Sequence, residues 1–472
     1  MVLTDADIKT LMAEITNRLA PGENQSPKRD TCNEPGCFSD IESAVTAAKK
    51  AQNKLAALSL EQRGKIIAAM REAARAKVRL VSEMAFQETG FGRINDKVIK
   101  NTLAIEKTPG IEDLPSRAYT GDNGLTLVES APFGVIGAIT PSTNPTATVI
   151  NNAIGMVSAG NAVVFHPHPG AKRASNQMIE LLNTAIASAG GPDNLLCTLG
   201  EPTLDSSRKL MEHPDVKLLV VTGGEAVVKV AMKSGKKVIA AGPGNPPVIV
   251  DDTANITKAA MDIVNGASFD NNILCIAEKE VLVFAKVADW FMAEMVRKQC
   301  YLLKEDEIPK VMALVLEKNH EGKYSPNKKF VGKDASYILR QSGIPVNEDY
   351  RLVIAAVDFE HPFVRTEMLM PVLPIVTVNN LGEAVEKAVI AENGCKHTAI
   401  MHSQNVGNLS TAARVLDTTI FVKNAPSYAG LGYLGEGFTT LTIATPTGEG
   451  LTSARTFTRQ RRCTLSGSFR II

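Results

Sequence analysis

Cys275 is the residue whose neighbours in the sequence most favour chemistry. Most cysteines pack as small hydrophobic side chains, so a thiol alone does not establish reactivity. Here the turn-forming residues 270–272 precede the thiol, and the apolar run 281–284 that follows is typical of a buried strand. This order places Cys275 between a loop and a strand, where a ligand can reach it and a thiolate can act as a nucleophile.

A second segment, residues 240–250, indicates which acceptor such a nucleophile serves. It is a Gly/Pro turn that leads into an apolar strand, and it contains no carboxylate and no histidine. These are the groups that most often act as general bases. A thiol nucleophile without a nearby base for water favours transfer of an acyl group to an acceptor other than water.

The composition bounds the class of protein. The chain has 472 residues, of which 44% are hydrophobic and 21% are charged, as is typical of a soluble globular protein. The formal net charge of +1 gives no field that would attract nucleic acid or an acidic membrane. No apolar run reaches the ~18 residues that span a bilayer, and the N-terminus lacks the basic start and apolar core of a secretion signal. We expect a cytoplasmic protein without nucleic-acid or membrane partners.

The cysteines favour a reducing compartment. They are odd in number and widely spread, unlike a disulfide framework; they are Cys32, Cys37, Cys197, Cys275, Cys300, Cys395 and Cys463. Cys32 and Cys37 have no second pair at the spacing of a zinc site, and the histidines fall singly apart from His166 and His168. We therefore expect no metal site.

The apolar pattern predicts an α/β fold in two domains. Between residues 135 and 234, strands and helices alternate, which predicts a parallel sheet with crossover helices. The strand ends, where ligands bind in such sheets, carry Gly, Pro, Ser, Thr or Asn. A second alternation begins with the strand 237–240, so we place the first domain at 39–240 and the second, with Cys275, at 241–440.

Two further segments are predicted to form an arm. A hairpin around the Asn-Gly pair is expected at about 115–131, and the C-terminal return 441–472 contains an alternating stretch typical of an exposed strand. Both suit pairing with another subunit. We expect a homodimer or a dimer of dimers.

The N-terminus has an organisation of its own. Apolar residues recur at helical spacing within 1–20 with charged residues between them, and the polar, Pro-broken stretch 21–38 is typical of a linker. Such a helix either docks on its own domain or binds a partner.

Taken together, the motifs identify a family. They lie, in order, at residues 132–136, 141–145, 159–165, 222–224, 240–250, 275 and 367–374. In order and spacing this set resembles the aldehyde dehydrogenase superfamily over about residues 40–465. Residues 242–247, 275–280, 397–403 and 457–462 resemble its CoA-acylating branch, the acetaldehyde and propionaldehyde dehydrogenases of bacterial microcompartments. The resemblance implies two doubly wound parallel-sheet domains, the first dinucleotide-binding and the second catalytic, with a β oligomerisation arm.

The resemblance also implies roles for individual residues. Cys275 is the expected nucleophile, and the side-chain amide of Asn144 is expected to stabilise the oxyanion. His397 is the candidate for accepting the proton of the CoA thiol, with a purely structural histidine as the alternative. NAD is expected to contact Thr140, Pro141, Ser142, His166, Pro167, Thr222, Gly223, Gly224, Ala241, Gly242, Glu367 and Leu369, with Glu367 positioning the nicotinamide ribose.

Departures from the hydrolytic relatives define the expected product. Ala241 falls where those enzymes carry the glutamate that activates water, 34 residues before Cys275. His166 replaces the usual lysine, and Pro169 replaces the glutamate that holds the adenosine ribose. We expect oxidation of a short-chain aldehyde with NAD+ and coenzyme A to acyl-CoA. A hydrolytic aldehyde dehydrogenase and a catalytically silent scaffold are the alternatives, and aldehyde chain length and the choice between NAD and NADP stay open.

The same resemblance predicts a function for the N-terminal helix. In the microcompartment branch, a short amphipathic N-terminal helix with a linker targets the enzyme to the inside of a protein shell. Residues 1–20 would accordingly bind a shell protein, and the enzyme would lie inside a bacterial microcompartment.

Overall fold

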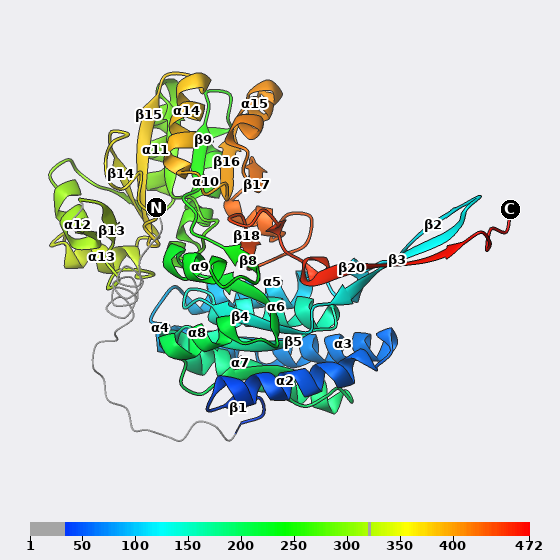
Figure 1. Ribbon diagram of the computed structural model, residues 1–472. Helices are drawn as coiled ribbons and strands as arrows, with labels where there is room; N and C mark the ends of the chain where they lie inside the picture. The colour runs from blue at the N-terminus through cyan, green and yellow to red at the C-terminus, as the bar shows by residue number, and fades with distance from the viewer. Residues whose placement is uncertain (1–33, 320–321) are drawn as a thin grey trace. The chain divides into compact units, whose positions relative to one another are not determined.

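The computed structural model describes residues 34–319 and 322–472, and the chain divides into two compact units (Figure 1). Unit 1 contains the described residues up to Thr89 together with Lys100–Gly242 and Phe438–Ile472, and unit 2 contains Gly90–Ile99 and Pro243–Gly437. The predicted N-terminal helix at 1–20 and most of the predicted linker lie outside the described residues.

A six-stranded parallel sheet forms the centre of unit 1, in the order β1-β6-β5-β4-β7-β8. Its strands are β1 (Cys37–Phe38), β4 (Val135–Thr140), β5 (Ala162–Pro167), β6 (Leu196–Leu199), β7 (Val216–Thr222) and β8 (Lys237–Ala241). The chain moves outward from β4 to β5 and β6, then crosses to the other side of β4 as β7. This reversal beside β4 is the switch point at which doubly wound sheets bind ligands.

Helices cover both faces of this sheet. Helices α2 and α8 contact each other and the strands, and α6 and α7 form a second contacting pair. The helices of unit 1 are α2 (Ile41–Ala56), α3 (Leu60–Ala76), α4 (Val78–Thr89), α6 (Pro145–Ser158), α7 (Lys172–Ser188), α8 (Leu204–Glu212) and α9 (Glu225–Met232), while α5 (Ile94–Lys107) begins in unit 2 and ends in unit 1.

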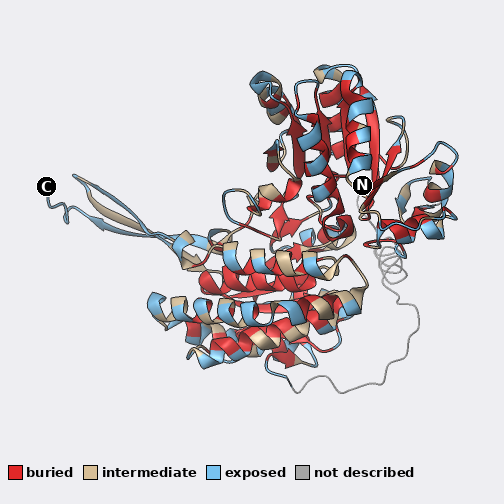
Figure 2. Cartoon of the chain, turned by 180° about the vertical axis from the view of Figure 1, so that it is seen from behind, coloured by how far each residue is buried: buried red, intermediate tan, exposed pale blue. Residues whose placement is uncertain are grey.

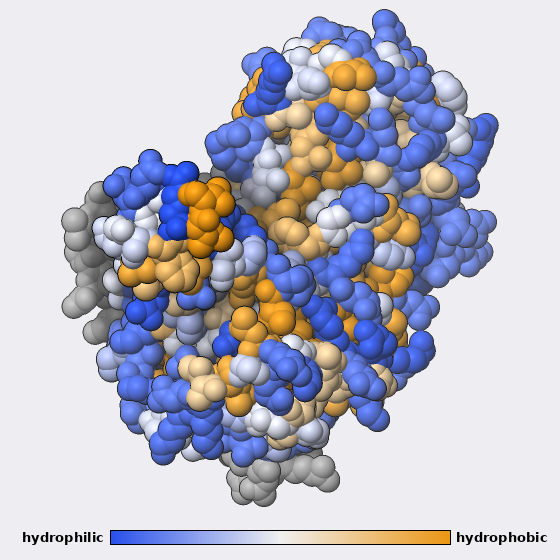
Figure 3. Space-filling view, turned by 90° about the vertical axis from the view of Figure 1, so that its right-hand side faces the viewer, coloured by the Kyte–Doolittle hydropathy of each residue, from blue (hydrophilic) through white to orange (hydrophobic). Residues whose placement is uncertain are grey.

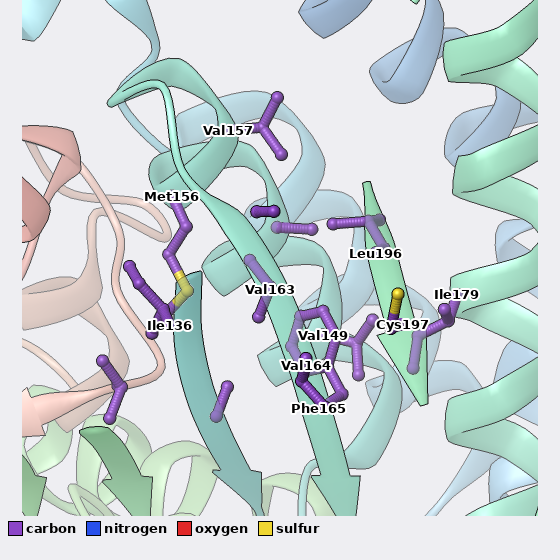
Figure 4. Close-up of a cluster of buried hydrophobic side chains, with 14 of the residues drawn as sticks. Ile136, Val149, Met156, Val157, Val163, Val164, Phe165, Ile179, Leu196 and Cys197 are labelled. Atoms are coloured by element: carbon purple, nitrogen blue, oxygen red, sulfur yellow. The ribbon is translucent and has the colours of Figure 1, made fainter. Parts of the chain in front are cut away.

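Helix α6 is the core helix of unit 1. Every residue from Pro145 to Ser158 is buried, as expected for a helix that is apolar on all sides. Figure 4 shows Val149, Met156 and Val157 of this helix among side chains of the neighbouring strands, such as Phe165 and Leu196. This packing fixes the position of the start of α6, and therefore the position of the loop that joins β4 to α6.

Strand β8 corrects one prediction from the sequence. Residues 237–240 were expected to open the second alternation, but β8 pairs with β7 from Leu218↔Lys237 to Thr222↔Ala241. It is an edge strand of the first sheet, and α9 supplies the crossover that leads into it. The apolar pattern alone does not distinguish the last strand of one sheet from the first strand of the next.

Unit 2 contains a seven-stranded parallel sheet in the order β11-β14-β15-β10-β9-β16-β17. These strands are β9 (Pro247–Val250), β10 (Glu280–Phe284), β11 (Cys300–Leu302), β14 (Leu352–Ala356), β15 (Val372–Val378), β16 (Thr398–His402) and β17 (Ile420–Lys423). Its helices are α10 (Ile256–Ser268), α11 (Ala288–Arg297), α12 (Ile308–Val315), α13 (Ala335–Gln341), α14 (Leu381–Glu392) and α15 (Val406–Leu416). Helices α10 and α11 pack together, as do α14 and α15.

The predicted hairpin and tail strand form one antiparallel ribbon in unit 1. Strand β3 (Gly124–Pro132) pairs with β2 (Arg117–Gly121) and, along its whole length, with β20 (Thr458–Ser466). A Cβ atom at Gly124 would lie 2.1 Å from the carbonyl oxygen of Leu465, so this position requires glycine. The ribbon is exposed or half-buried along its length (Figure 2). Its pairing with another subunit stays a prediction.

Hydrophilic and hydrophobic side chains are interspersed on the face seen in Figure 3. None of the helices in the described residues is both long enough and apolar enough to cross a membrane.

Candidate active site

Cys275 lies between a short 3-10 helix, η3 (Phe269–Asn272), and strand β10, and it is partly exposed. Three consecutive residues before it, Asp270, Asn271 and Asn272, have positive φ angles of 47°, 54° and 65°. Asp and Asn adopt this left-handed conformation more readily than other residues with side chains. The turn chemistry predicted from the sequence is therefore present, and it bends the backbone sharply just before the thiol.

Buried polar contacts hold this bend. Oδ1 of Asp270 accepts a hydrogen bond of 2.6 Å from the backbone N–H of Arg93, and Oδ2 lies 3.2 Å from Nζ of Lys97. The Asn271 amide donates to the carbonyl oxygen of Gly332 at 2.9 Å. Segment 90–99 thus belongs to the framework of the nucleophile, which the sequence did not indicate.

Lys279, which follows Cys275 in the sequence, also holds this loop. Its Nζ atom contacts the carbonyl oxygen and Oδ1 of Asn272 and the carbonyl oxygen of Leu274. Lys279 is 1% exposed, and its neighbours Glu278 and Glu280 are 0% exposed. The sequence contains no signal for this role, because a run of charged residues is typical of a solvated surface.

The Gly/Pro turn before β9 brings three candidate residues together. A Cβ atom at Gly244 would lie 2.5 Å from the carbonyl oxygen of Cys275 and 3.0 Å from Cγ of His397. The backbone N–H of Gly244 donates to Oε1 of Glu367 at 3.3 Å. The Asn245 amide anchors the turn through two buried carbonyl oxygens, each at 2.9 Å. Cys275, His397 and Glu367 therefore surround Gly244.

His397 is fully buried. Its Nδ1 and Oγ1 of Thr398 share a hydrogen bond of 2.9 Å, and its backbone N–H donates to Oε1 of Glu392 at 2.9 Å. Nε2 has no hydrogen-bond partner among the described residues. Burial lowers the pKa of His397 to about 4, so the ring is neutral near pH 7. A neutral imidazole with an open nitrogen can accept a proton.

Glu367 is half-buried, and burial raises its pKa while Lys279 and the N–H of Gly244 act in the opposite direction. Leu369 has a positive φ of 52°, and its carbonyl oxygen accepts a hydrogen bond from the N–H of Gly332. Both residues precede β15. The four candidate residues of unit 2 therefore lie before the amino ends of strands: Cys275 before β10, Glu367 and Leu369 before β15, and His397 before β16.

Asn144, in unit 1, follows β4 and is the N-cap residue of α6. Its side chain makes no capping bond to the helix. Instead, Nζ of Lys100 donates to Oδ1 at 2.5 Å, and Nδ2 lies 3.3 Å from Oγ1 of Thr143. Lys100 fixes which end of the amide is the donor, and it is a residue that the sequence analysis missed, because it lies 44 positions upstream.

The predicted dinucleotide contacts of unit 1 all lie at the carboxyl edge of its sheet. They are Thr140, Pro141 and Ser142 at the end of β4, His166 and Pro167 at the end of β5, Thr222, Gly223 and Gly224 at the end of β7, and Ala241 and Gly242 at the end of β8. Parallel strands bring these ends to one edge, which is where doubly wound sheets bind dinucleotides. The structure thus gathers residues spread over a hundred positions.

Three observations fit a dinucleotide at this edge. Gly224 is the N-cap of α9, so the first N–H groups of that helix can receive phosphate oxygens. A Cβ atom at Gly223 would lie 2.9 Å from a side-chain methyl group of Val227, which explains why the turn carries no side chain there. Thr140 is buried, and its Oγ1 lacks a hydrogen-bond partner among the described residues.

His166 is 5% exposed, and its Nε2 lies 2.8 Å from Oγ of Ser206. Burial lowers its pKa to about 4, so the ring is neutral near pH 7 and offers no positive charge to a phosphate. Within the described residues, no group of three or more His, Cys, Asp or Glu side chains could hold a metal ion.

A doubly wound unit with a glycine turn and a second parallel-sheet unit with a loop-borne cysteine are the parts of an aldehyde dehydrogenase. The family model described as "Aldehyde dehydrogenase family" matches residues 36–431, and the chain belongs to this family.

Individual relatives cover all or most of the chain. Over 472 residues, all of both chains, it is 47% identical to the acetaldehyde dehydrogenase (acetylating) EutE of Escherichia coli strain K12. A solved propionaldehyde dehydrogenase from the fucose utilisation microcompartment of Clostridium phytofermentans is 49% identical, with a TM-score of 0.91 over 93% of this chain and 100% of that one. A Rhodopseudomonas palustris propionaldehyde dehydrogenase, solved with bound CoA and an acylated cysteine, is 48% identical with a TM-score of 0.89, over 92% of this chain and 98% of that one.

Proposed function

We propose that this protein is a CoA-acylating aldehyde dehydrogenase that converts a short-chain aldehyde, NAD+ and coenzyme A to acyl-CoA and NADH. The observation that carries the proposal is Ala241. This buried, apolar residue ends β8 at the position where hydrolytic relatives carry a water-activating glutamate. A thioester on Cys275 would therefore hydrolyse slowly and would react with a thiol acceptor instead.

The first half-reaction forms the thioester. The Cys275 thiolate attacks the aldehyde carbon, and the carbonyl oxygen becomes an oxyanion. Nδ2 of Asn144, held as a donor by Lys100, and the backbone N–H of Cys275 stabilise that charge. The residues at the carboxyl edge of unit 1 and Glu367 would hold NAD+, which would supply the acceptor for the hydride that leaves as the carbonyl re-forms. The products of this half are the thioacyl enzyme and NADH.

The second half-reaction transfers the acyl group. The CoA thiol loses its proton to His397, whose neutral ring has an open Nε2, and the CoA thiolate attacks the thioester carbon. Collapse of the second tetrahedral intermediate expels the Cys275 thiolate and releases acyl-CoA. The apolar residues beside the nucleophile, Ile273, Leu274 and Ile276, are buried, in keeping with a small unfunctionalised aldehyde.

Trapping the thioester tests this proposal. The protein is incubated with propionaldehyde and NAD+ without CoA, and the peptide that contains Cys275 is analysed by mass spectrometry. We expect one propionyl group on Cys275, which CoA then releases as propionyl-CoA. Cys275→Ala serves as the control and should carry no acyl group. A thioester that water removes as fast as CoA does would favour the hydrolytic alternative.

We also propose that residues 1–20 direct the enzyme into a microcompartment shell and that the β2–β3–β20 ribbon pairs subunits into a homodimer or a dimer of dimers. Deletion of residues 1–20 should leave activity unchanged and abolish co-purification with shells. Loss of activity would instead assign the segment to the enzyme core. The mass of the protein in solution tests the subunit count, and a monomer would contradict the role given to the ribbon.

A further inference from the structure

Lys279 is a buried cation that the mechanism above does not use. Its Nζ lies 2.9 Å from the carbonyl oxygen of Asn272, 2.5 Å from Oδ1 of Asn272 and 3.1 Å from the carbonyl oxygen of Leu274. Three acceptors around one nitrogen require three N–H bonds. A neutral amine has two and an ammonium has three, so the geometry calls for the charged form.

The acceptors show what the ammonium holds. All three belong to the loop that ends in Cys275, and one of the two residues involved, Asn272, has a positive φ of 65°. If Lys279 were replaced by an apolar residue, these buried oxygens would lose a hydrogen-bond donor. The lost free energy would destabilise this conformation of the loop. Lys279, directly before β10, thus braces the nucleophile loop.

The same charge acts on the thiol. Burial lowers the pKa of Lys279, whereas the carboxylate of Glu367 and the thiolate of Cys275 act to raise it. This coupling is mutual, because an ammonium that is favoured by a thiolate favours that thiolate in turn.

Other titratable groups also face Lys279. Glu278 and Glu280 are its neighbours in the chain, and Glu367 and His397 face it from the segments before β15 and β16. Glu278 accepts two hydrogen bonds from Ser427. Burial raises the pKa of Glu278 to about 7 and that of Glu280 well above its usual range. Burial thus favours the neutral form of both carboxyl groups, whereas the charge of Lys279 favours their ionised form.

We propose that Lys279 is a positioning residue that holds the loop in front of Cys275 and keeps the nucleophile in its thiolate form. The inference deepens the proposed function and rests on it, because it assigns Lys279 a part in the use of Cys275 as the nucleophile.

Alkylation of Cys275 by iodoacetamide, measured across a pH series, tests the proposal. The peptide that contains Cys275 is quantified by mass spectrometry, so that other cysteines do not interfere. The wild-type rate should reach half its maximum clearly below the ordinary thiol value of about 8.5. Lys279→Met should move that midpoint up by at least about one pH unit, which makes alkylation at pH 7 about tenfold slower.

Lys97→Met is the matched control. Lys97 is also a buried lysine of unit 2 that braces the same loop, through Asp270 at 3.2 Å. Its removal should lower the temperature of unfolding and leave the alkylation midpoint unchanged. Lys279→Gln keeps an N–H donor but loses the charge, so it should show the same midpoint shift as Lys279→Met and a smaller loss of stability.

Two results would overturn the proposal. One is a wild-type midpoint at or above about 8.5, which decides the question even where neither Lys279 variant folds. The other is a folded Lys279→Met or Lys279→Gln protein with an unshifted midpoint. The experiment uses no aldehyde, NAD+ or CoA, so it is independent of the overall reaction. A shifted midpoint in a protein that forms no acyl-CoA would reject the proposed function and leave the role of Lys279 intact.

Discussion

Replacing Gly244 with alanine should disable the enzyme by displacing its nucleophile. The new Cβ atom would lie 2.5 Å from the carbonyl oxygen of Cys275 and 3.0 Å from Cγ of His397. The φ angle of Gly244 does not lie in the left-handed region, so alanine meets no backbone strain of its own. The effect is a collision with the two residues that the reaction needs.

The size of the effect follows from the contact distances. Ordinary van der Waals contact for a Cβ atom begins at 3.4 Å, so the carbonyl of Cys275 must move by about 0.9 Å. This atom belongs to the backbone and cannot rotate away as the end of a side chain can. A displacement of about 1 Å at the reacting group costs about a hundredfold in rate. Overpacking should also destabilise the fold by roughly 1–3 kcal/mol.

The assay measures NADH and acyl-CoA production at saturating aldehyde, NAD+ and CoA, together with alkylation of Cys275. We expect kcat to fall by about a hundredfold in protein that is still folded at the assay temperature. Gly64→Ala in α3 is the control, since its Cβ would meet only the tip of the Ile111 side chain at 3.3 Å; it should retain full activity. A Gly244→Ala protein with wild-type turnover would refute the arrangement of Cys275 and His397 around Gly244.

Three further predictions concern single residues. Lys100→Met frees the Asn144 amide to rotate, so kcat should fall by about a hundredfold, the usual cost of losing one oxyanion donor, with alkylation of Cys275 unchanged; unaltered kcat would show that Lys100 does not orient the amide. The pKa of His397 is about 4 in the folded protein and 6.5 in the unfolded chain. As the pH falls, the unfolded chain therefore binds the proton first, and the free energy of unfolding decreases by roughly 3 kcal/mol between pH 6.5 and pH 4. Chemical denaturation of His397→Asn should show a shallower loss over this range, and an identical profile would mean that the ring is already charged in the fold. Ala241→Glu should introduce some CoA-independent formation of free acid, whereas a thioester that stays inert to water would show that the missing carboxylate does not determine the acceptor.

The sequence predicted those parts of the fold that depend on local patterns. The β4–α6–β5 unit follows from an apolar run, Pro145 at the start of α6 and a glycine turn before β5, and it lies within the alternation of strands and helices predicted for residues 135–234. The turn before Cys275 was also predictable, because Asp and Asn tolerate the left-handed conformation that residues 270–272 adopt.

The rest depends on contacts between distant parts of the chain. Segment 90–99 belongs to unit 2 because the N–H of Arg93 and the ammonium of Lys97 bind Asp270, which lies more than 170 positions later. Lys100 has no local signal that links it to Asn144. Lys279 lies in a run of three charged residues, which in isolation is typical of a solvated surface, and its burial becomes visible only with the sheet in place.

The dependence of turnover on CoA tests the central claim most directly. The protein is mixed with propionaldehyde and NAD+, with and without CoA, while NADH, acyl-CoA and free acid are all measured. We predict a single burst of NADH, no larger than the number of active sites, when CoA is absent, and steady turnover to propionyl-CoA when it is present. Steady NADH production without CoA, with propionate as the product, would contradict the account.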